Sequence, residues 1–430
     1  MATATAKRTK RDGGQTDAIT YGDLYRRWEE GNWKAYDLDF SQDRNGWEAL
    51  SEIQRKSALW IYSMFFFGED SVTDNLSPYI DAAPLEEQKY FLASQQIDEA
   101  RHAIFFHRFF SEVVGAGDDI AATLAFTEQH LGWGYRQVFN RLDKMADELR
   151  RDRSLPKFAQ AITLYHLVVE AAMAQPGQHF IEDFFVREGT MPGFSAGMEH
   201  VSRDEQRHIG FGVKVLSELL AESDECKAAV DELLTEVMPW LSSVFIPPNW
   251  DREYTRCYGF ELEEIAAWGF KAVEMKWKAI GYPMQEMPPG VAPIDFELEP
   301  IDRATNVIKM AQAGVIGEPG QDPDSSAEIQ QLYFDSVSRA VDPSVVNGHG
   351  PFTVQWRFSD APPWHLVVAN DSTRAEPGEA ADANVTLEAS WRDFIEVSKG
   401  AVAPPLALLQ RRLKLRGGPR NLLTFAKLFG

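Results

Sequence analysis

The sequence predicts a mainly helical bundle that holds a dinuclear metal site, followed by a smaller C-terminal α+β domain. Three observations lead to this fold class. Apolar residues recur at three- and four-residue spacings in long blocks between Trp47 and Tyr282. A short Asp-Glu-x-Arg-His motif occurs twice within those blocks. Beyond a proline-rich segment, the pattern changes to the strict alternation that is typical of β-strands.

Length and composition narrow the possible functions. The chain of 430 residues is long enough for two or three domains. A net charge of −22 argues against nucleic acid as a partner, since phosphate binding needs an excess of Lys and Arg. Two cysteines cannot form a disulfide framework, so we expect a reducing, cytoplasmic location. The longest apolar runs are too short to predict a transmembrane segment.

The helical part is expected to span residues 20–285, after a polar tail at 1–19 that we expect to be disordered. Helix breakers such as Pro84, Pro156 and Pro192 separate its blocks. Such long blocks favour a helical bundle over an α/β sheet. The blocks are 59–67, 91–110, 158–185 and 194–220.

The rest of the chain is predicted to form a linker and a second domain. Residues 286–326 are rich in proline, and only 302–312 look helical, so we expect an extended linker across the bundle surface. Residues 327–430 are predicted to be α+β. The predicted strands are 352–358, 364–369 and 384–389, and the predicted helices are 327–341, 391–399 and 403–415.

The doubled motif carries the strongest chemical signal. It occurs at residues 98–102 as Asp-Glu-Ala-Arg-His and at 204–208 as Asp-Glu-Gln-Arg-His. Residues three apart lie on one face of a helix, so the Glu and His of each copy can bind one metal ion together. A single Glu-x-x-His pair is more often a solvated surface pair, but two copies on separate long helices are much more specific.

Two further glutamates, Glu69 and Glu170, are embedded in apolar sequence. A buried carboxylate is costly unless it is paired, hydrogen-bonded or bound to metal. One Glu from each of two helices and a Glu-x-x-His pair from each of two others form the dinuclear carboxylate site of some four-helix bundles. Carboxylate oxygens with one imidazole per metal favour iron or manganese over zinc. The predicted ligands are Glu69, Glu99, His102, Glu170, Glu205 and His208.

Residues beside the ligands have two possible roles. Asp204 is expected to accept a hydrogen bond from a ligand histidine and so to orient it; the alternative is a simple surface aspartate. Arg101 and Arg207 either pair with carboxylates near the site or are surface charges, and the sequence does not decide between these.

The helical region resembles the R2-like ligand-binding oxidases, which are relatives of the ribonucleotide reductase small subunit. The resemblance covers roughly residues 20–285. It implies a ferritin-like bundle with a Mn/Fe or Fe/Fe cofactor that activates O2 and holds a fatty-acid-like ligand in an apolar cavity. A homodimer is also expected. The residues that carry the resemblance are 31–44, 68–73, 165–170 and 204–208.

The resemblance also implies roles for residues near the metals. Tyr165 and Val72 occupy the positions of a tyrosine–valine ether cross-link in that family. The alternative is that Tyr165 is a core tyrosine whose hydroxyl has found a partner. Four apolar side chains are candidates for the cavity wall, although at helical spacing they could equally be plain core. They are Phe65, Phe66, Phe106 and Met173.

Three positions depart from related enzymes. Phe106 stands where the reductase subunit usually carries its radical tyrosine, which argues against a reductase role. Residues 35–38 stand where both families tend to carry a tryptophan of an electron route, so the electron donor is unknown. Val201 stands where N-oxygenases of the same bundle class have an extra histidine, which counts against that activity.

The C-terminal region resembles the sterol carrier protein 2 (SCP2-like) lipid-binding domain, which implies an apolar tunnel under a five-stranded sheet. The alternative is an α+β domain used only for dimerisation. The residues that carry this resemblance are 350–356, 364–368, 382–387, Phe394 and 413–417.

The sequence therefore predicts an O2-activating dinuclear oxidase or oxygenase that acts on a hydrophobic, lipid-like substrate. Two alternatives are a metal-containing lipid carrier without turnover and an N-oxygenase. One further feature is the charge of residues 401–430, which contain six Lys or Arg and no Asp or Glu. We expect this basic end to contact either an anionic membrane or, preferably, the acidic bundle.

Overall fold

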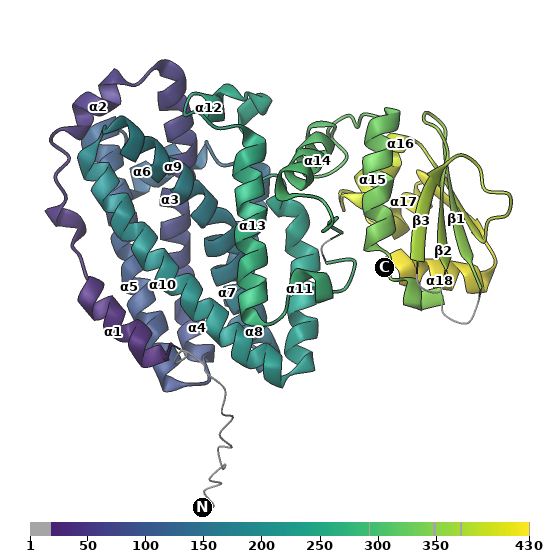
Figure 1. Ribbon diagram of the computed structural model, residues 1–430, viewed down its shortest axis with the longest axis horizontal. Helices are drawn as coiled ribbons and strands as arrows, with labels where there is room; N and C mark the ends of the chain where they lie inside the picture. Colours follow the sequence, from purple (N-terminus) through teal and green to yellow (C-terminus); the bar gives the residue numbers. More distant parts are fainter. Residues whose placement is uncertain (1–18, 292, 347–349, 370–371, 430) are drawn as a thin grey trace, which may run out of the picture.

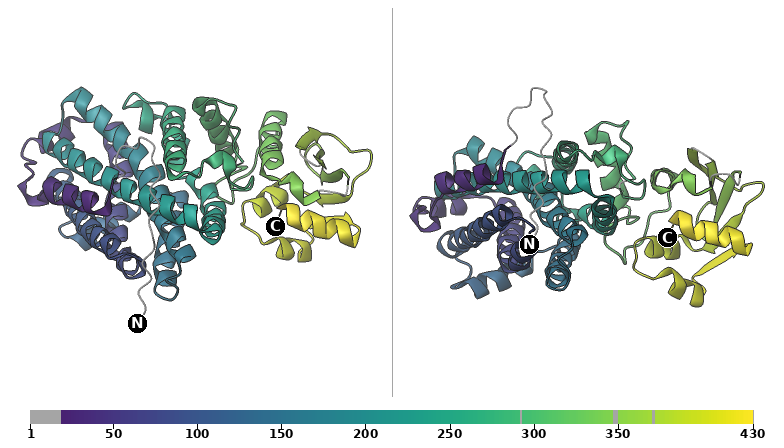
Figure 2. Two further views of the ribbon diagram at one scale, coloured as in Figure 1. Left: turned by 60° about the horizontal axis from the view of Figure 1, so that its bottom comes forward. Right: turned by 90° about the horizontal axis from the view of Figure 1, so that it is seen from below.

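The computed structural model describes residues 19–429 except for 292, 347–349 and 370–371 (Figure 1). The predicted tail at 1–19 therefore lies almost entirely outside the described residues. A large helical bundle and a smaller α+β domain lie side by side, and each has its own hydrophobic core (Figures 1 and 2). Among the described helices, none has the length and apolar character needed to cross a bilayer.

Four long helical segments form the centre of the bundle. They are α3 (Glu52–Asn75), α5 (Glu86–Phe109), α10 (Pro192–Glu222) and a continuous stretch made of α8 (Leu155–Ile162), the π-helix η3 (Thr163–Ala174) and α9 (Gln175–Glu188). The predicted helical blocks lie within these segments, except that Phe110 belongs to the short π-helix η2 (Phe110–Val114) that follows α5. Surrounding helices are α1 (Tyr21–Gly31), α2 (Asp43–Ala49), α4 (Ser77–Ala82), α6 (Ile120–Glu128), α7 (Trp133–Leu149), α11 (Asp224–Leu241), α12 (Glu253–Arg256) and α13 (Leu262–Ile280).

Local sequence signals fix the ends of these helices. Ser51 caps α3 by accepting a hydrogen bond from the Gln54 backbone N–H, and the Gln54 side chain accepts one from the Ser51 N–H. Pro156 and Pro192 stand in the first turns of α8 and α10, where a missing N–H costs nothing.

The proline-rich segment is less extended than we expected. It contains α14 (Pro300–Gln312), which matches the predicted helix and packs between α13 and α15 (Ala327–Ala340). Met287 and Val291, before α14, are buried in the bundle core, whereas Met310 belongs to the core of the C-terminal domain. The segment therefore contributes apolar side chains to both cores.

The C-terminal domain is a five-stranded sheet with helices. The strand order is β3-β2-β1-β4-β5; β1 pairs in parallel with β4, and the other pairs are antiparallel. Phe334 of α15 stacks on Trp364 with ring centroids 4.7 Å apart, in an interior filled by aromatic rings. The strands are β1 (Phe352–Phe358), β2 (Trp364–Ala369), β3 (Ser372–Pro377), β4 (Val385–Ala389) and β5 (Leu413–Gly417).

The sequence missed one strand of this domain and wrongly predicted a helix at another. Strand β3 was not predicted, because its mostly polar sequence lacks apolar alternation. Residues 403–415 do not form one helix: α17 (Pro404–Leu409) ends, Arg411 takes a left-handed φ of 60°, and the chain then enters β5. The pairing of β5 with β4 outweighs the local helix pattern. The last helices are α16 (Trp391–Ser398) and α18 (Pro419–Phe429).

Candidate metal centre

Each of the four central helical segments contributes to one buried cluster. Glu69 comes from α3, Glu170 from η3, and the two Glu-x-x-His pairs come from α5 and α10. Because η3 is a π-helix, its residues are wound more widely than in an α-helix, and such segments are often found at functional sites. The predicted order of Glu, Glu-x-x-His, Glu, Glu-x-x-His on four helices is present.

The start of α10 is held in place by a buried carboxylate. Asp43 accepts hydrogen bonds from the backbone N–H groups of Gly193 at 2.9 Å and Phe194 at 2.6 Å. A negative charge here also interacts favourably with the helix dipole. Met191, just before the helix, takes a left-handed φ of 51°. These contacts fix the position of the helix that carries the second Glu-x-x-His pair.

The six predicted ligands form two overlapping groups. In each group, one candidate ligand atom per residue lies within 4.8 Å of the others. Both groups contain Glu99 and Glu205, so these two carboxylates lie between the two candidate metal positions. All six side chains are buried. The first group is Glu69, Glu99, His102 and Glu205, and the second is Glu99, Glu170, Glu205 and His208.

Distances show how the histidines face the cluster. His102 Nδ1 lies 3.2 Å from both Glu69 Oε2 and Glu99 Oε2. His208 Nδ1 lies 3.2 Å from the other oxygen of Glu99, Oε1, and 3.5 Å from Glu170 Oε1. The two oxygens of Glu99 therefore face different histidines, as expected of a carboxylate that bridges two metal ions.

The other nitrogen of each histidine faces an aspartate from the opposite motif. His102 Nε2 lies 3.3 Å from Asp204 Oδ2, and His208 Nε2 lies 3.1 Å from Asp98 Oδ2. Asp204 thus has the expected contact with a ligand histidine, and Asp98 occupies the equivalent place on the other side. An aspartate at this position orients the imidazole and leaves Nδ1 free to bind metal.

Two arginines complete this layer. Arg101 pairs with Asp98, and Arg207 pairs with both Asp98 and Asp204, at 2.9 Å in the latter case. Both arginines are buried, so they are not surface charges. Two guanidinium groups balance two carboxylates behind the histidines, which lowers the cost of burying the aspartates.

A tryptophan that sequence reasoning missed caps this layer. The indole Nε1 of Trp33 donates a hydrogen bond to Asp204 Oδ2 at 2.8 Å, and Trp28 donates one to Asp98 Oδ1 at 2.9 Å. Residues 35–38 contain no tryptophan, but Trp33, just before them, contacts this layer through Asp204. The available signal was that Trp33 lies within 31–44, one of the segments that carry the resemblance to the R2-like oxidases.

Burial and charge shift the pKa values within the cluster. Burial raises the pKa of Glu69 and of Glu170 to about 7. Burial would also raise the pKa of Glu99, but the neighbouring His208 and His102 lower it to about 2. Burial and the nearby carboxylates Glu170 and Glu99 raise the pKa of Glu205 well above its usual value. Buried carboxylates that repel one another in this way favour a cation between them.

Buried atoms without partners support the fit of metal ions. Oε2 of Glu170 and Oε2 of Glu205 make no hydrogen bond to any described residue. An unpaired buried carboxylate oxygen is costly, and a metal ion would satisfy it. With four carboxylates and two imidazoles, the cluster fits two ions of the iron or manganese type.

Gln95 was not predicted from the sequence but contacts the same cluster. Its Nε2 donates a hydrogen bond to Glu170 Oε1 at 2.7 Å, and its Oε1 lies 3.1 Å from His166 Nε2. Burial lowers the pKa of His166 to about 3, so this imidazole is neutral and donates its Nε2 proton to Gln95. The spacing of Gln95 four residues before Glu99 was the available signal.

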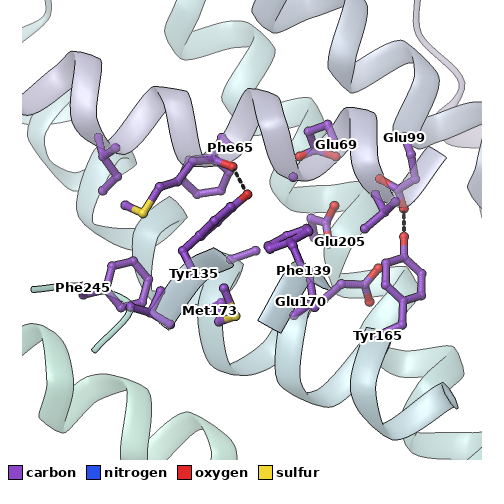
Figure 3. Close-up of a pocket in the computed structure, with 17 residues that line it drawn as sticks. Phe65, Glu69, Glu99, Tyr135, Phe139, Tyr165, Glu170, Met173, Glu205 and Phe245 are labelled. Carbon is purple, nitrogen blue, oxygen red and sulfur yellow. Dashed lines mark hydrogen bonds between the residues drawn. The ribbon is translucent and has the colours of Figure 1, made fainter. Parts of the chain in front are cut away.

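A pocket opens onto the cluster (Figure 3). Four carboxylates lie toward one end, and Phe65, Met173 and Phe245 lie toward the other (Figure 3). Of the four candidate wall residues, Phe65 and Met173 line the pocket. Phe66 and Phe106 do not: Phe66 packs near Phe110, and Phe106 stacks behind Phe65 with ring centroids 5.8 Å apart.

Tyr165 and Val72 line the same pocket. The Tyr165 hydroxyl donates a hydrogen bond to Glu99 Oε1 at 2.5 Å (Figure 3). Tyr165 is therefore tied to a carboxylate shared by both candidate metal positions. Val201, where N-oxygenases carry a histidine, is buried on α10 and offers no ligand atom.

Comparison with known proteins agrees with this arrangement. The family "ribonucleotide reductase, small chain" matches residues 18–239, and the SCP-2 sterol transfer family matches residues 336–430. An R2-like ligand-binding oxidase variant with an anaerobically reconstituted Mn/Fe cofactor is 23% identical, with a TM-score of 0.52. This similarity covers 63% of this chain and 98% of that protein.

A second solved structure has the same fold. The R2-like ligand-binding oxidase from Sulfolobus acidocaldarius is 22% identical over 67% of this chain and 95% of its own, with a TM-score of 0.53. At such identities the likeness establishes the fold of the bundle. The match over 18–239 covers more than half of the chain and includes all six predicted ligands, so the chain belongs to the ribonucleotide reductase small-chain family, with an SCP2 domain at its C-terminal end.

Proposed function

We propose that the protein is a dinuclear metal oxidase or oxygenase that uses O2 to oxidise a hydrophobic, lipid-like molecule. One observation carries this proposal: a single pocket joins a cluster of four carboxylates to an apolar wall (Figure 3). A substrate with an anionic headgroup and a hydrocarbon body matches such a pocket. Two structural relatives with a reconstituted Mn/Fe cofactor support Mn/Fe, with Fe/Fe as the second possibility.

The residues of the site have distinct tasks. When bound, two redox-active ions would supply the open coordination positions and electrons that O2 activation requires. Glu99 and Glu205 would bind both ions, and the outward Asp98 and Asp204 would keep each ligand imidazole in its metal-binding orientation. The apolar wall, including Phe65 and Met173, would keep water away from the reacting atoms.

We also propose the ether cross-link between Tyr165 and Val72. As the C–O bond forms, the Tyr165 hydroxyl and the Val72 side chain would each lose one hydrogen atom, and O2, the oxidant, would take up both and leave as hydrogen peroxide. Aerobic loading with Fe(II) and Mn(II) should lower the intact mass by two hydrogen atoms. The Tyr165→Phe variant is the control, because it lacks the oxygen that would form the bond. An unchanged mass after full metal loading would contradict the cross-link.

The central experiment is turnover of a lipid-like substrate. Protein reconstituted with Fe(II) and Mn(II) would be given O2 and a panel of fatty acids, with products identified by mass spectrometry. We expect O2 consumption with formation of an oxidised product, and its loss in the Glu99→Ala variant. If the metals bind but no lipid is turned over, the enzymatic proposal is wrong.

That last outcome would favour a carrier. In this second candidate function, the metals only anchor a carboxylate headgroup, and the SCP2 domain exchanges the lipid. The observation that favours it is the presence of two modules in one chain, one of which matches a sterol transfer family. A lipid that copurifies unchanged and is released when the metals are removed would support it.

We further propose that the protein is a homodimer through α5. Five residues at alternating three- and four-residue spacing form an apolar stripe that the described part of the chain leaves at least partly open. Such spacing suits two helices packed against each other. The stripe consists of Tyr90, Ala93, Ile97, Ala100 and Ile104.

A charge in the stripe should separate the subunits. The test variant is Ile97→Glu, because Ile97 is 55% exposed in the stripe. The control is Met275→Glu, at an equally exposed position on α13. Light scattering should show a monomer for the first variant and a dimer for the second. A monomeric unsubstituted protein would contradict the proposal.

We also propose a cytoplasmic location, which the two free cysteines suit, and the electron donor is unidentified.

A further inference from the structure

The C-terminal end of the chain forms a surface that is both basic and apolar. Its elements are α17, the edge strand β5 and α18, and both helices pack beside β5. We define the basic C-terminal surface as the exposed leucines and cations of these elements. They are Leu406, Leu408, Leu409, Arg411, Lys414, Arg416, Arg420, Leu423 and Lys427. Residues 401–430 contain no Asp or Glu, in a protein whose net charge is −22.

Exposed leucines lie next to cations on this surface. On α18, Leu423 is 67% exposed; Arg420 precedes it by three residues and Lys427 follows it by four, so all three share one helical face. The opposite face of α18 buries Leu428 in the domain core. At the end of α17, Leu409 is 81% exposed and Arg411 follows two residues later.

Most of these cations have no acidic partner. Arg412 and Arg416 pair with Asp393 and Glu388, acids of the same domain. Among the described residues, no ion pair joins an acid to Arg411, Lys414, Arg420 or Lys427. The ion pairs of this segment thus stay within its own domain, which does not support the contact with the acidic bundle that we favoured from the sequence.

We propose that the basic C-terminal surface binds the face of an anionic lipid bilayer. Exposed leucines can enter the boundary between headgroups and acyl chains, while the long stems of Lys and Arg keep their charges at the headgroups. The rest of this acidic protein is repelled by such a bilayer, so the attraction is confined to one edge and orients the molecule. The proposed lipid function explains why the protein would bind a membrane, and in that sense this proposal rests on it. Membrane binding itself is measured without turnover, so the two can fail separately.

The test uses the full chain and sedimentation with vesicles. Vesicles of phosphatidylcholine alone are compared with vesicles that also contain phosphatidylglycerol. The surface variant is Arg420→Glu with Lys427→Glu. The matched control is Lys144→Glu with Arg151→Glu, which makes the same change of net charge at exposed positions of the bundle. Circular dichroism checks that both variants fold.

We expect the unsubstituted protein and the control to bind anionic vesicles alike, more weakly as salt rises. Losing one cation near the surface lowers lipid partitioning about fivefold, so the surface variant should bind at least about 25-fold more weakly. A Leu423→Ser variant should also bind more weakly but keep the salt dependence. Equal binding by surface variant and control would overturn the proposal. So would equal binding to both kinds of vesicle, or binding to the soluble polyanion heparin without binding to vesicles.

Discussion

The indole nitrogen of Trp33 lies 2.8 Å from Asp204 Oδ2, and the same oxygen lies 3.3 Å from Nε2 of the ligand His102. A tryptophan from the segment after α1 is thereby connected to the candidate metal centre through one carboxylate. Trp33 also stacks on His200, with ring centroids 4.9 Å apart, and His200 is partly exposed. This arrangement links the buried cluster to the edge of the bundle.

Replacing Trp33 with Phe tests this connection. The Trp33→Phe variant keeps an aromatic ring but removes the donor to the buried Asp204 carboxylate. We expect the free energy of unfolding to fall by about 1.5–3 kcal/mol, the range for a hydrogen bond to a charged group. Urea titration measures it. Trp240→Phe is a suitable control, because no hydrogen bond from its indole nitrogen is seen among the described residues. Equal losses in both variants would show that the Asp204 contact is unimportant.

Asp204→Asn tests the orientation of His102. Asparagine keeps the shape of the aspartate side chain but lacks the negative charge that holds the proton on Nε2 of His102. We expect metal affinity to fall about 10- to 100-fold, as is typical when the partner of a ligand histidine is lost. Competition with a chromophoric chelator measures the affinity. Asp98→Asn should have a similar effect through His208, because the two contacts are equivalent. An unchanged affinity in both variants would refute this role.

Replacing a carboxylate shared by both candidate metal positions should affect the number of bound ions differently from replacing one that belongs to a single position. Glu69 belongs to one group only, so Glu69→Ala leaves Glu99, Glu170, Glu205 and His208 intact and should retain one ion. Glu99 belongs to both groups, so Glu99→Ala should weaken both ions. Elemental analysis after dialysis against dilute metal gives the counts. Two ions retained by Glu99→Ala would mean that this carboxylate does not bridge.

The metal-free protein should show a pH dependence set by Glu69 and Glu170. Burial raises both pKa values from 4.5 to about 7, so the folded state holds more protons than the unfolded state between these pH values. The stability from these groups is therefore present below pH 4.5 and is lost as the pH rises to about 7. Thermal unfolding of metal-free protein over this range measures it. A Glu69→Gln variant should show a smaller slope, and an unchanged slope would contradict the assignment.

Binding of Mn(II) should release protons, since metal ions compete with protons for the same carboxylates. Calorimetry near pH 7 in two buffers with different protonation enthalpies gives the number released. We expect affinity to increase with pH through this range. Equal apparent enthalpies in both buffers would mean that the cluster is already deprotonated before the metal binds.

The sequence by itself predicted the bundle, the six residues that meet in the buried cluster and most of the C-terminal strands. These features depend on local spacing: three residues within one helical turn place a Glu and a His together, and alternation marks a strand such as 352–358. The sequence also predicted that Asp204 supports a ligand histidine, but it did not predict the equivalent role of Asp98.

Only the tertiary structure decided how these pieces meet. Asp98 serves the histidine of the other motif, and Trp33 reaches Asp204 across 171 residues of sequence, which no local pattern encodes. Likewise, residues 413–417 become a strand because β4 offers hydrogen-bonding partners that outweigh their helical pattern. Phe66 and Phe106 face packed core and Phe65 faces the pocket, because the direction of each ring depends on neighbouring helices. Contacts between distant segments are set by packing, and packing is a property of the whole fold.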